Sequence, residues 1–219
     1  MKRINVVTSV LQANDAVARE SRARLDAAGV LALNLMSAPG SGKTTLLERT
    51  LPTLGLQRCA VLVGDLQTTR DAERLCDKAS AVTQINTGQG CHLTATQVST
   101  ALGGLTLDGL DFLFIENVGN MVCPAAFDLG EHRRVVLLSV PEGDDKVAKY
   151  PTLFQAADVV LLTKVDLCGV LQYDLERVRA DLARLNTRAP LLQVSCRSGA
   201  GLPEWVAWLT AQQAAAKPA

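Results

Sequence analysis

Several features that would mark other classes of protein are missing from this sequence. None of its apolar runs is long enough to cross a membrane. It has no basic excess or stripe of the kind usual in nucleic-acid-binding proteins, since 22 Lys and Arg residues balance 22 Asp and Glu residues. Its first twenty residues lack the unbroken apolar run and the small-residue cleavage site of a secretory signal. We therefore expect a cytoplasmic protein with no membrane span and no nucleic-acid partner.

Histidine is scarce, and nothing indicates an oxidising compartment for the cysteines. The chain has two histidines and six cysteines, and the cysteines are expected to be reduced thiols that are buried or available for metal. No internal repeat, low-complexity tract or Pro/Gly-rich linker divides the chain. We expect one domain over residues 30–215. Residues 1–29 are expected to form an amphipathic helical extension that ends at Gly29 and packs on it.

Apolar segments recur along the chain, with helix-length segments between many of them. Most are continuous rather than alternating, which is typical of strands buried on both faces of a parallel sheet. The expected strands lie at residues 30–37, 58–64, 81–85, 111–117, 134–140, 158–164 and 189–195. The alternation of strand and helix predicts an α/β fold, with a mainly parallel sheet of about seven strands flanked by helices.

The first strand leads into the turn SAPGSGKTT (37–45). It matches the phosphate-loop pattern G-x-x-x-x-G-K-[ST], except that Ser37 replaces the first glycine. The turn follows a buried strand and opens an apolar helix, so main-chain N–H groups and the helix N-terminus would face a phosphate; the alternative is an ordinary turn with an exposed lysine. Lys43 would reach the β- and γ-phosphates, and the Thr44 hydroxyl would hold Mg²⁺. The predicted phosphate-binding residues are Gly40, Ser41, Gly42, Lys43, Thr44 and Thr45.

Two acidic residues end other strands. Asp65 closes VLVGD and Glu116 closes FLFIE. In an open α/β sheet, ligands bind at the carboxyl ends of the strands, so both carboxylates should face the phosphate loop and hold Mg²⁺ or its waters. The alternative for each is a helix cap or a solvated loop residue.

A later motif, TKVDL (163–167), indicates which base is bound. It is the guanine-reading pattern N-K-x-D with Thr163 in place of Asn. Asp166 could accept both N–H groups of guanine, whereas adenine would leave a buried carboxylate unpaired. The Lys164 stem would lie over the base or brace the phosphate loop. The main-chain N–H groups of Ser195 and Cys196, in VSCRSG, would face the guanine O6. We therefore predict GTP rather than ATP as the nucleotide.

A further set of residues suits a softer metal. The stretch TGQGCHL (87–93) places Cys91 beside His92, and ENVGNMVCP (116–124) contains Cys123. Thiolate and imidazole suit Ni²⁺, Zn²⁺ or copper rather than Mg²⁺. Three donors fall short of the four in a closed structural zinc site, and a two-fold dimer would bring six. The alternative is that these cysteines are buried and inert.

The remaining soft side chains are expected to be structural. His132 precedes a strand and is expected at the surface, with a weak fourth metal donor as the alternative. Burial as inert thiols is expected for Cys59, Cys76, Cys168 and Cys196.

Together, several motifs closely resemble the HypB family of hydrogenase nickel-incorporation GTPases, in unbroken order from about residue 30 to residue 200. They are SAPGSGKTTLLE, GDLQTTRDAERL, TGQGCHL, ENVGNMVCP, FDLGEH, SVPEGDDKVAKYP and TKVDL. The resemblance implies a P-loop GTPase of the dimerising SIMIBI class. It implies delivery of Ni²⁺ to the precursor of a [NiFe]-hydrogenase large subunit, with a HypA-type nickel chaperone as partner.

By motif, the resemblance assigns the family's nucleotide-gated metal site to Cys91, His92 and Cys123. This site would be shared across a homodimer promoted by GTP and metal, with zinc possible in place of nickel. Lys146 or Lys149 would act in trans near the nucleotide. Slow intrinsic turnover is expected, because no obvious water-orienting glutamine follows Glu116. The residues expected to act in GTP hydrolysis are Lys43, Thr44, Asp65 and Glu116.

One departure from the family pattern and three alternatives remain. The first twenty residues contain no Cys and no His, so we expect no N-terminal nickel site of the kind some family members have. One alternative is a UreG-type urease nickel chaperone, although that family has C-P-H in place of adjacent Cys and His. The others are a GTP switch with a structural zinc and an ATP-dependent kinase of a small substrate.

Overall fold

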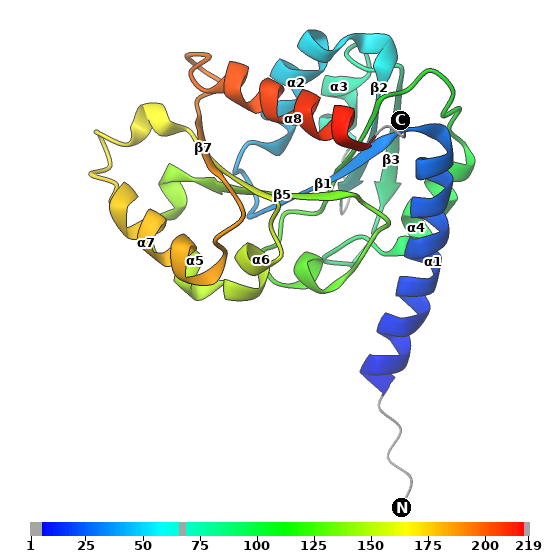
Figure 1. The fold of residues 1–219 in the computed structure, drawn as a ribbon, viewed down its shortest axis with the longest axis horizontal. Helices are drawn as coiled ribbons and strands as arrows, with labels where there is room; N and C mark the ends of the chain where they lie inside the picture. The colour runs from blue at the N-terminus through cyan, green and yellow to red at the C-terminus, as the bar shows by residue number, and fades with distance from the viewer. Residues whose placement is uncertain (1–5, 66–68, 217–219) are drawn as a thin grey trace, which may run out of the picture.

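The computed structural model describes residues 6–65 and 69–216, which form a parallel sheet with helices on both faces (Figure 1). The strands are β1 (Leu31–Ser37), β2 (Cys59–Asp65), β3 (Ala81–Asn86), β4 (Phe112–Glu116), β5 (Arg133–Ser139), β6 (Val159–Thr163) and β7 (Leu191–Val194). They are hydrogen-bonded in the order β3-β2-β4-β1-β5-β6-β7, and each neighbouring pair is parallel. The predicted α/β fold, with about seven strands in a mainly parallel sheet, is confirmed.

The central strands are mostly apolar because both of their faces are covered. Every residue of β1, β4 and β6 is buried. A strand with one solvated face would alternate polar and apolar residues, as these segments do not. The sheet is therefore the middle layer of three.

Helices form the two outer layers, and Figure 1 shows α2, α3 and α8 on one side of the sheet and α4 to α7 on the other. The helices are α1 (Val6–Ala28), α2 (Lys43–Leu54), α3 (Arg70–Leu75), α4 (Ala95–Gly103), α5 (Lys146–Lys149), α6 (Pro151–Gln155), α7 (Leu175–Leu185) and α8 (Leu202–Ala216). Short 3-10 turns are η1 (Leu56–Arg58), η2 (Cys123–Ala126), η3 (Val140–Glu142) and η4 (Val165–Leu167). Helix α1 lies beside α4 and stops at Gly29, whose φ of 67° is unfavourable for residues with a side chain.

A buried tryptophan joins the two longest helices of one layer. Trp205 on α8 is fully buried against the sheet, and its Nε1–H donates a hydrogen bond to Thr50 Oγ1 on α2 over 3.0 Å. Burying an indole contributes on the order of 2–3 kcal/mol, and the hydrogen bond satisfies its one polar atom. This contact holds α2, the helix that follows the phosphate loop, firmly against the sheet.

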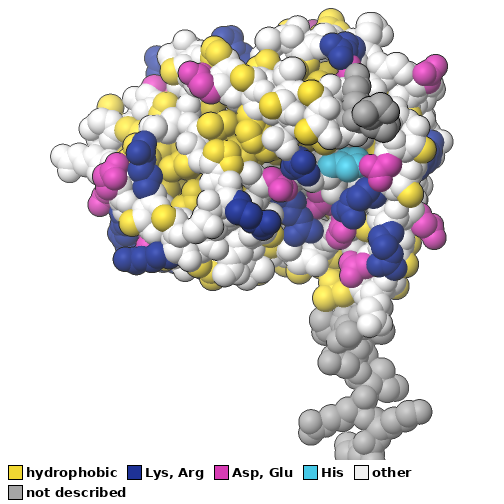
Figure 2. All heavy atoms as spheres, viewed as in Figure 1, with side chains coloured by type: hydrophobic (Ala, Val, Ile, Leu, Met, Phe, Trp, Pro, Cys, Tyr) yellow, Lys and Arg dark blue, Asp and Glu magenta, His cyan; other side chains and the backbone are white. Residues whose placement is uncertain are grey.

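The surface carries charges of both signs. Figure 2 shows Lys, Arg, Asp and Glu side chains interspersed on one face, with hydrophobic side chains between them, and no stripe of one sign. Among the described helices, none combines the length and the apolar composition needed to span a bilayer.

The strand order places the predicted site at one edge of the sheet. The chain moves outward from β1 in both directions, so the loops after β1 and its neighbours β4 and β5 diverge there. Ligands of open α/β sheets bind at such a switch point, outside the carboxyl ends of the strands. Asp65, Glu116 and Thr163 end β2, β4 and β6 at this edge, and Ser195 directly follows β7.

Candidate nucleotide and metal sites

The phosphate loop lies between β1 and α2. Gly40 and Gly42 have φ of 75° and 98°, values that side chains disfavour, so both glycines are required by the backbone. Lys43 is buried and its Nζ donates to Ser37 Oγ over 3.0 Å. Burial lowers the pKa of Lys43, against the opposing effect of Glu116. Ser37 is the last residue of β1, so the position of the first glycine of the usual pattern is extended strand here and tolerates a side chain.

Two of the predicted Mg²⁺ ligands, Thr44 and Glu116, are hydrogen-bonded to each other. The Thr44 hydroxyl donates to Glu116 Oε1 over 2.7 Å, and Glu116 is only 4% exposed. Its other oxygen, Oε2, is buried without a hydrogen-bond partner among the residues that the structure describes. Burial raises the pKa of Glu116 to about 7, with Lys43 acting in the opposite direction. An unsatisfied buried carboxylate oxygen beside a hydroxyl is a donor set that fits Mg²⁺ or a water bound to it.

Two further carboxylates share this end of the site. Asp65 and Asp71 line a cavity of about 210 Å³ together with Lys43 and Glu116. Asp65 was predicted from its place at the end of β2. Asp71 lies in the first turn of α3 and was missed, because a helix-starting Asp is common and carries no special signal in a sequence.

The predicted base-reading residues other than Ser195 line a second cavity, of about 300 Å³. Lys164 Nζ donates to Gly40 O over 2.7 Å, and Thr163 Oγ1 donates to Ser41 O over 2.7 Å, so both residues brace the phosphate loop. Lys164 has a φ of 59°, which turns the chain sharply after β6. The cavity is lined by Ser41, Gly42, Thr45, Thr163, Lys164, Asp166, Leu167, Cys196 and Arg197.

Ser195 acts differently from the expectation. The main-chain N–H of Ser195, predicted to face a base oxygen, already donates to Ala200 O over 2.9 Å. Its hydroxyl instead donates to Asp166 Oδ1 over 2.6 Å and orients that carboxylate. The N–H of Ser195 is taken up by the turn that follows β7, and a sequence motif cannot reveal this.

The three predicted soft donors converge from two segments. Cys91 Sγ lies 3.1 Å from Cys123 Sγ and 3.6 Å from His92 Nδ1. The ligand atoms of all three residues lie within 4.8 Å of one another, and Cys91 is exposed while the other two are half-buried. The neighbouring Cys91 raises the pKa of Cys123, and burial lowers that of His92, which favours the neutral imidazole that binds metals. The cluster is therefore open to solvent and composed of soft ligands.

Two neighbours that sequence reasoning missed shape this cluster. The His92 ring stacks on Phe127, with centroids 4.0 Å apart. Asn120 Nδ2 donates to Cys91 O over 3.2 Å, which ties the two donor-bearing segments together. Neither contact has a signal in the sequence, because each depends on how two loops meet.

His132 does not belong to the cluster. It precedes β5, at the amino end of the strands, and its side chain is 13% exposed. Its Nδ1 accepts the N–H of Ala32 over 2.9 Å, and its Nε2 lies 2.9 Å from Asp26 Oδ1. His132 is therefore half-buried rather than fully at the surface, because α1 and the start of β1 cover part of it.

The other cysteines follow the expectation of burial only in part. Cys59 is fully buried in β2, and burial raises the pKa of its thiol to about 12. Cys168 and Cys196 are half-buried. Cys76 is exposed, which contradicts the prediction: it follows α3, whose buried residue Leu75 points into the core one position earlier.

The two lysines considered as trans-acting residues pair within their own chain. Lys146 Nζ lies 3.1 Å from Asp145 Oδ1, and Lys149 forms an ion pair with the other oxygen of the same carboxylate. Both pairs belong to the solvent-accessible turn at α5, where such contacts contribute little to stability.

The chain is similar to known proteins along nearly its whole length. The family described as CobW/HypB/UreG, nucleotide-binding domain, matches residues 31–193. The hydrogenase maturation factor HypB of Azotobacter chroococcum mcd 1 is 49% identical over 217 residues, which are 98% of this chain and 70% of that protein. The hydrogenase/urease maturation factor HypB of Helicobacter hepaticus is 48% identical over 198 residues, 89% of this chain and 81% of its own length. The crystal structure of HypB from Helicobacter pylori in complex with nickel matches with a TM-score of 0.89 and 41% identity, over 94% of this chain and 97% of that one.

Proposed function

The chain belongs to the HypB family of CobW/HypB/UreG nucleotide-binding proteins, and we propose that it is a GTP-hydrolysing metallochaperone that delivers nickel to the large subunit of a [NiFe]-hydrogenase during maturation. The observation that carries this proposal is the cluster of Cys91, His92 and Cys123, whose ligand atoms lie within 4.8 Å of one another. Thiolate and imidazole suit Ni²⁺. The HypB of Helicobacter pylori that was crystallised with nickel supports the same metal here.

Guanine is the base that we propose for the cavity beside Asp166. Its carboxylate, oriented by the Ser195 hydroxyl, would accept the N1–H and N2–H₂ groups of guanine. Adenine has an acceptor at N1 and would leave this carboxylate unpaired. The main chain at Cys196 would face the guanine O6. A kinase of a small substrate would instead prefer ATP, so a nucleotide competition measurement separates the two functions.

Hydrolysis is proposed to depend on the residues around the phosphate loop. Thr44, Asp65 and Glu116 would hold Mg²⁺, which neutralises the charge that develops on the phosphates. Lys43 would bind the β- and γ-phosphates from its buried position. No glutamine occurs between Glu116 and Cys123 to orient a water molecule, so we expect slow intrinsic turnover.

The metal site is proposed to be completed by a second copy of the chain. Three donors are fewer than a closed site needs, and their exposure leaves room for ligands from a partner. GTP would favour the dimer, the dimer would bind Ni²⁺, and hydrolysis would loosen the site and release the metal. Coupling of this kind is reciprocal, so nickel must also change the affinity for GTP. A HypA-type nickel chaperone and the hydrogenase large-subunit precursor are the proposed partners, and Lys146 or Lys149 would act across the dimer.

The test is an anaerobic Ni²⁺ titration of the GDP form and of the form with a non-hydrolysable GTP analogue, with the molecular mass measured in parallel. We expect tighter nickel binding and a dimer in the analogue form. Cys91→Ala should weaken nickel binding at least tenfold in that form. Cys76→Ala, which removes an exposed cysteine just after α3, is the matched control and should change nothing. Unchanged nickel binding in Cys91→Ala would refute the metal assignment.

A second candidate is service to urease instead of hydrogenase. It is favoured by one observation, the name hydrogenase/urease maturation factor carried by the Helicobacter hepaticus relative. Nickel transfer to each purified apoprotein in turn distinguishes the two roles. A switch with a structural zinc would keep its metal through a round of hydrolysis, whereas a delivery protein would lose it.

A further inference from the structure

A network of four polar side chains, three of them buried, links the nucleotide site to the soft-donor cluster. It begins at Asn117, which follows Glu116 and is 1% exposed. The Asn117 Oδ1 accepts the N–H of Leu93 over 3.2 Å and that of Val118 over 3.0 Å. Leu93 is the residue after His92, so one amide oxygen holds the cysteine-histidine segment to the end of β4.

Asn34 on β1 is the middle member of this network. The Asn117 Nδ2 donates to Asn34 Oδ1 over 3.1 Å, and Asn34 Nδ2 donates to Glu131 Oε1 over 3.4 Å. Asn34 and Glu131 are 0% and 4% exposed. Each amide donates to the next residue and accepts from the one before, so turning either amide over would break bonds on both sides.

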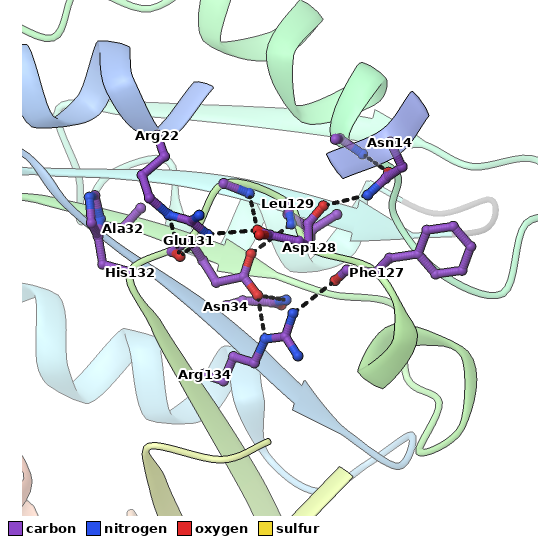
Figure 3. A network of polar contacts seen from close by, with 12 residues as sticks. Asn14, Arg22, Ala32, Asn34, Phe127, Asp128, Leu129, Glu131, His132 and Arg134 are labelled. Atoms are coloured by element: carbon purple, nitrogen blue, oxygen red, sulfur yellow. Dashed lines mark hydrogen bonds and ion pairs between the residues drawn. The ribbon is translucent and has the colours of Figure 1, made fainter. Parts of the chain in front are cut away.

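The last member of this network is Arg134 on β5, shown in Figure 3 with its guanidinium between Glu131 and Phe127. Its Nε donates to Glu131 Oε1 over 2.7 Å. Its two terminal nitrogens donate to Ala125 O over 3.3 Å and to Phe127 O over 3.4 Å. These carbonyls belong to the η2 turn and the residue after it, which carry Cys123 and the ring that stacks on His92.

The first and last members of this network therefore hold the two halves of the donor cluster. Asn117 holds the segment with Cys91 and His92, and Arg134 holds the turn with Cys123. The Glu131 carboxylate is buried and the Arg134 guanidinium is half-buried, and an ion pair of this kind is weak evidence for stability, so we attribute it to the geometry that it imposes. The nucleotide end also touches the phosphate loop, because a Cβ at Gly119 would lie 2.8 Å from Pro39 Cα.

We propose that Arg134 is a positioning residue that couples the nucleotide state to metal affinity, acting through Glu131, Asn34 and Asn117. The proposal rests on the proposed nickel function. When the nucleotide changes the position of Glu116 and Asn117, this network moves the Cys91 segment relative to the turn held by Arg134. The spacing between the sulfur atoms changes, and with it the affinity for metal.

A purely structural role for the same residues is the competing explanation. The network also reaches α1, through Arg22, which donates to Asp128 Oδ1 over 2.7 Å and to Glu131 O over 2.7 Å. If Arg134 only stabilised this packing, its loss would lower the melting temperature or weaken metal binding equally in both nucleotide forms. Coupling is distinguished by the ratio of the nickel dissociation constants in the GDP and GTP-analogue forms.

The test measures this ratio by anaerobic Ni²⁺ titration of the full chain carrying Arg134→Lys. Lysine keeps the charge beside Glu131 but cannot donate to both carbonyls in the planar fork of arginine. A coupled system has a ratio of roughly 5 to 150, and we expect Arg134→Lys to bring it to within about twofold of one. Affinity for the GTP analogue should stay within about twofold of the wild-type value. Arg133→Lys is the matched control, because this neighbour on β5 bonds Gln212 on α8, and its ratio should be unchanged.

The outcomes separate this proposal from the function on which it rests. A wild-type ratio of one would overturn both. A wild-type ratio that persists in folded Arg134→Lys, or an equal loss of nickel affinity in both forms, would overturn only the coupling role. Asn34→Ala removes the hydrogen bonds in the middle of the network and changes no residue of either donor segment. It should collapse the ratio in the same way, and it decides the question if Arg134→Lys melts at a markedly lower temperature.

Discussion

Glu116 determines much of the chemistry at the phosphate end of the site. It is 4% exposed, and one oxygen accepts the Thr44 hydroxyl over 2.7 Å. The other oxygen is buried without a partner among the described residues. A charge left in this position costs free energy, as the raised pKa of about 7 reflects. A divalent cation would offset that cost, which supports the Mg²⁺ site proposed above.

This burial predicts an unusual pH dependence of stability in the protein without nucleotide or divalent metal. The pKa of Glu116 is raised from 4.5 to about 7, so the folded state holds a proton that the unfolded chain releases. The contribution of Glu116 to stability is therefore fully present below about pH 4.5 and is lost as the pH rises through about 7, by up to roughly 3 kcal/mol. Glu116→Gln should remove this loss between pH 5 and pH 8. Urea unfolding at both pH values in EDTA measures it.

The control is Glu204→Gln, which neutralises an exposed carboxylate on α8 and should follow the wild-type pH profile. Equal pH profiles for Glu116→Gln and the wild type would show that Glu116 is not protonated in the folded state at neutral pH.

At the scale of elements, two short segments connect the nucleotide site to the soft donors. Residues 87–93 follow β3 and residues 117–123 follow β4. Each packs closely where a glycine leaves room. A Cβ at Gly64 on β2 would lie 2.8 Å from Leu93 Cγ, and one at Gly119 would lie 2.8 Å from Pro39 Cα. Real Cβ atoms do not approach so closely, so movement of β2 would be transmitted to the first segment and movement of the phosphate loop to the second.

Gly119→Ala tests the contact between the second segment and the phosphate loop. The added methyl group meets backbone atoms of Pro39, so the loop or the segment has to shift. We expect GDP affinity to fall about tenfold, because overpacking of this kind costs about 1–3 kcal/mol. Fluorescent-nucleotide titration measures the change. Gly103→Ala in α4, where a Cβ meets nothing within 4 Å, should leave the affinity as it is. Unchanged GDP affinity in Gly119→Ala would mean that the loop and the segment move independently.

The elements that could be predicted from the sequence are those with local signals. The strands are continuous apolar runs, and the phosphate loop combines its glycines with Lys43 in nine residues. The network of polar side chains that links the two sites has no such signal. Asn34 and Glu131 are 97 positions apart, and Asn34 and Asn117 are 83 apart, so each reads as an ordinary strand or loop residue. The partial burial of His132 has no local signal for the same reason, since its partner Ala32 lies 100 positions away.

At the scale of the whole molecule, the donor cluster lies on a surface that suits contact with a second copy. Cys91 is exposed, and Val122, the residue before Cys123, is 63% exposed although it is apolar. A two-fold axis near the cluster would bring two copies of Val122 toward each other, together with six donors. Apolar contact and shared metal would then stabilise the same dimer.

Val122→Lys should therefore weaken the dimer that we propose to form with Ni²⁺ and a GTP analogue. Two ammonium groups would face each other across the axis, close to a divalent cation, and the apolar contact would be lost. We expect the dimer dissociation constant to rise at least tenfold, equivalent to about 1.4 kcal/mol, while each monomer keeps its nucleotide affinity. Sedimentation velocity over a range of protein concentrations measures this. Val170→Lys, at a valine that is 77% exposed in the turn after η4, is the matched control and should leave the dimer intact. Equal effects of the two substitutions would mean that the interface lies elsewhere and that the second set of donors does not come from this face.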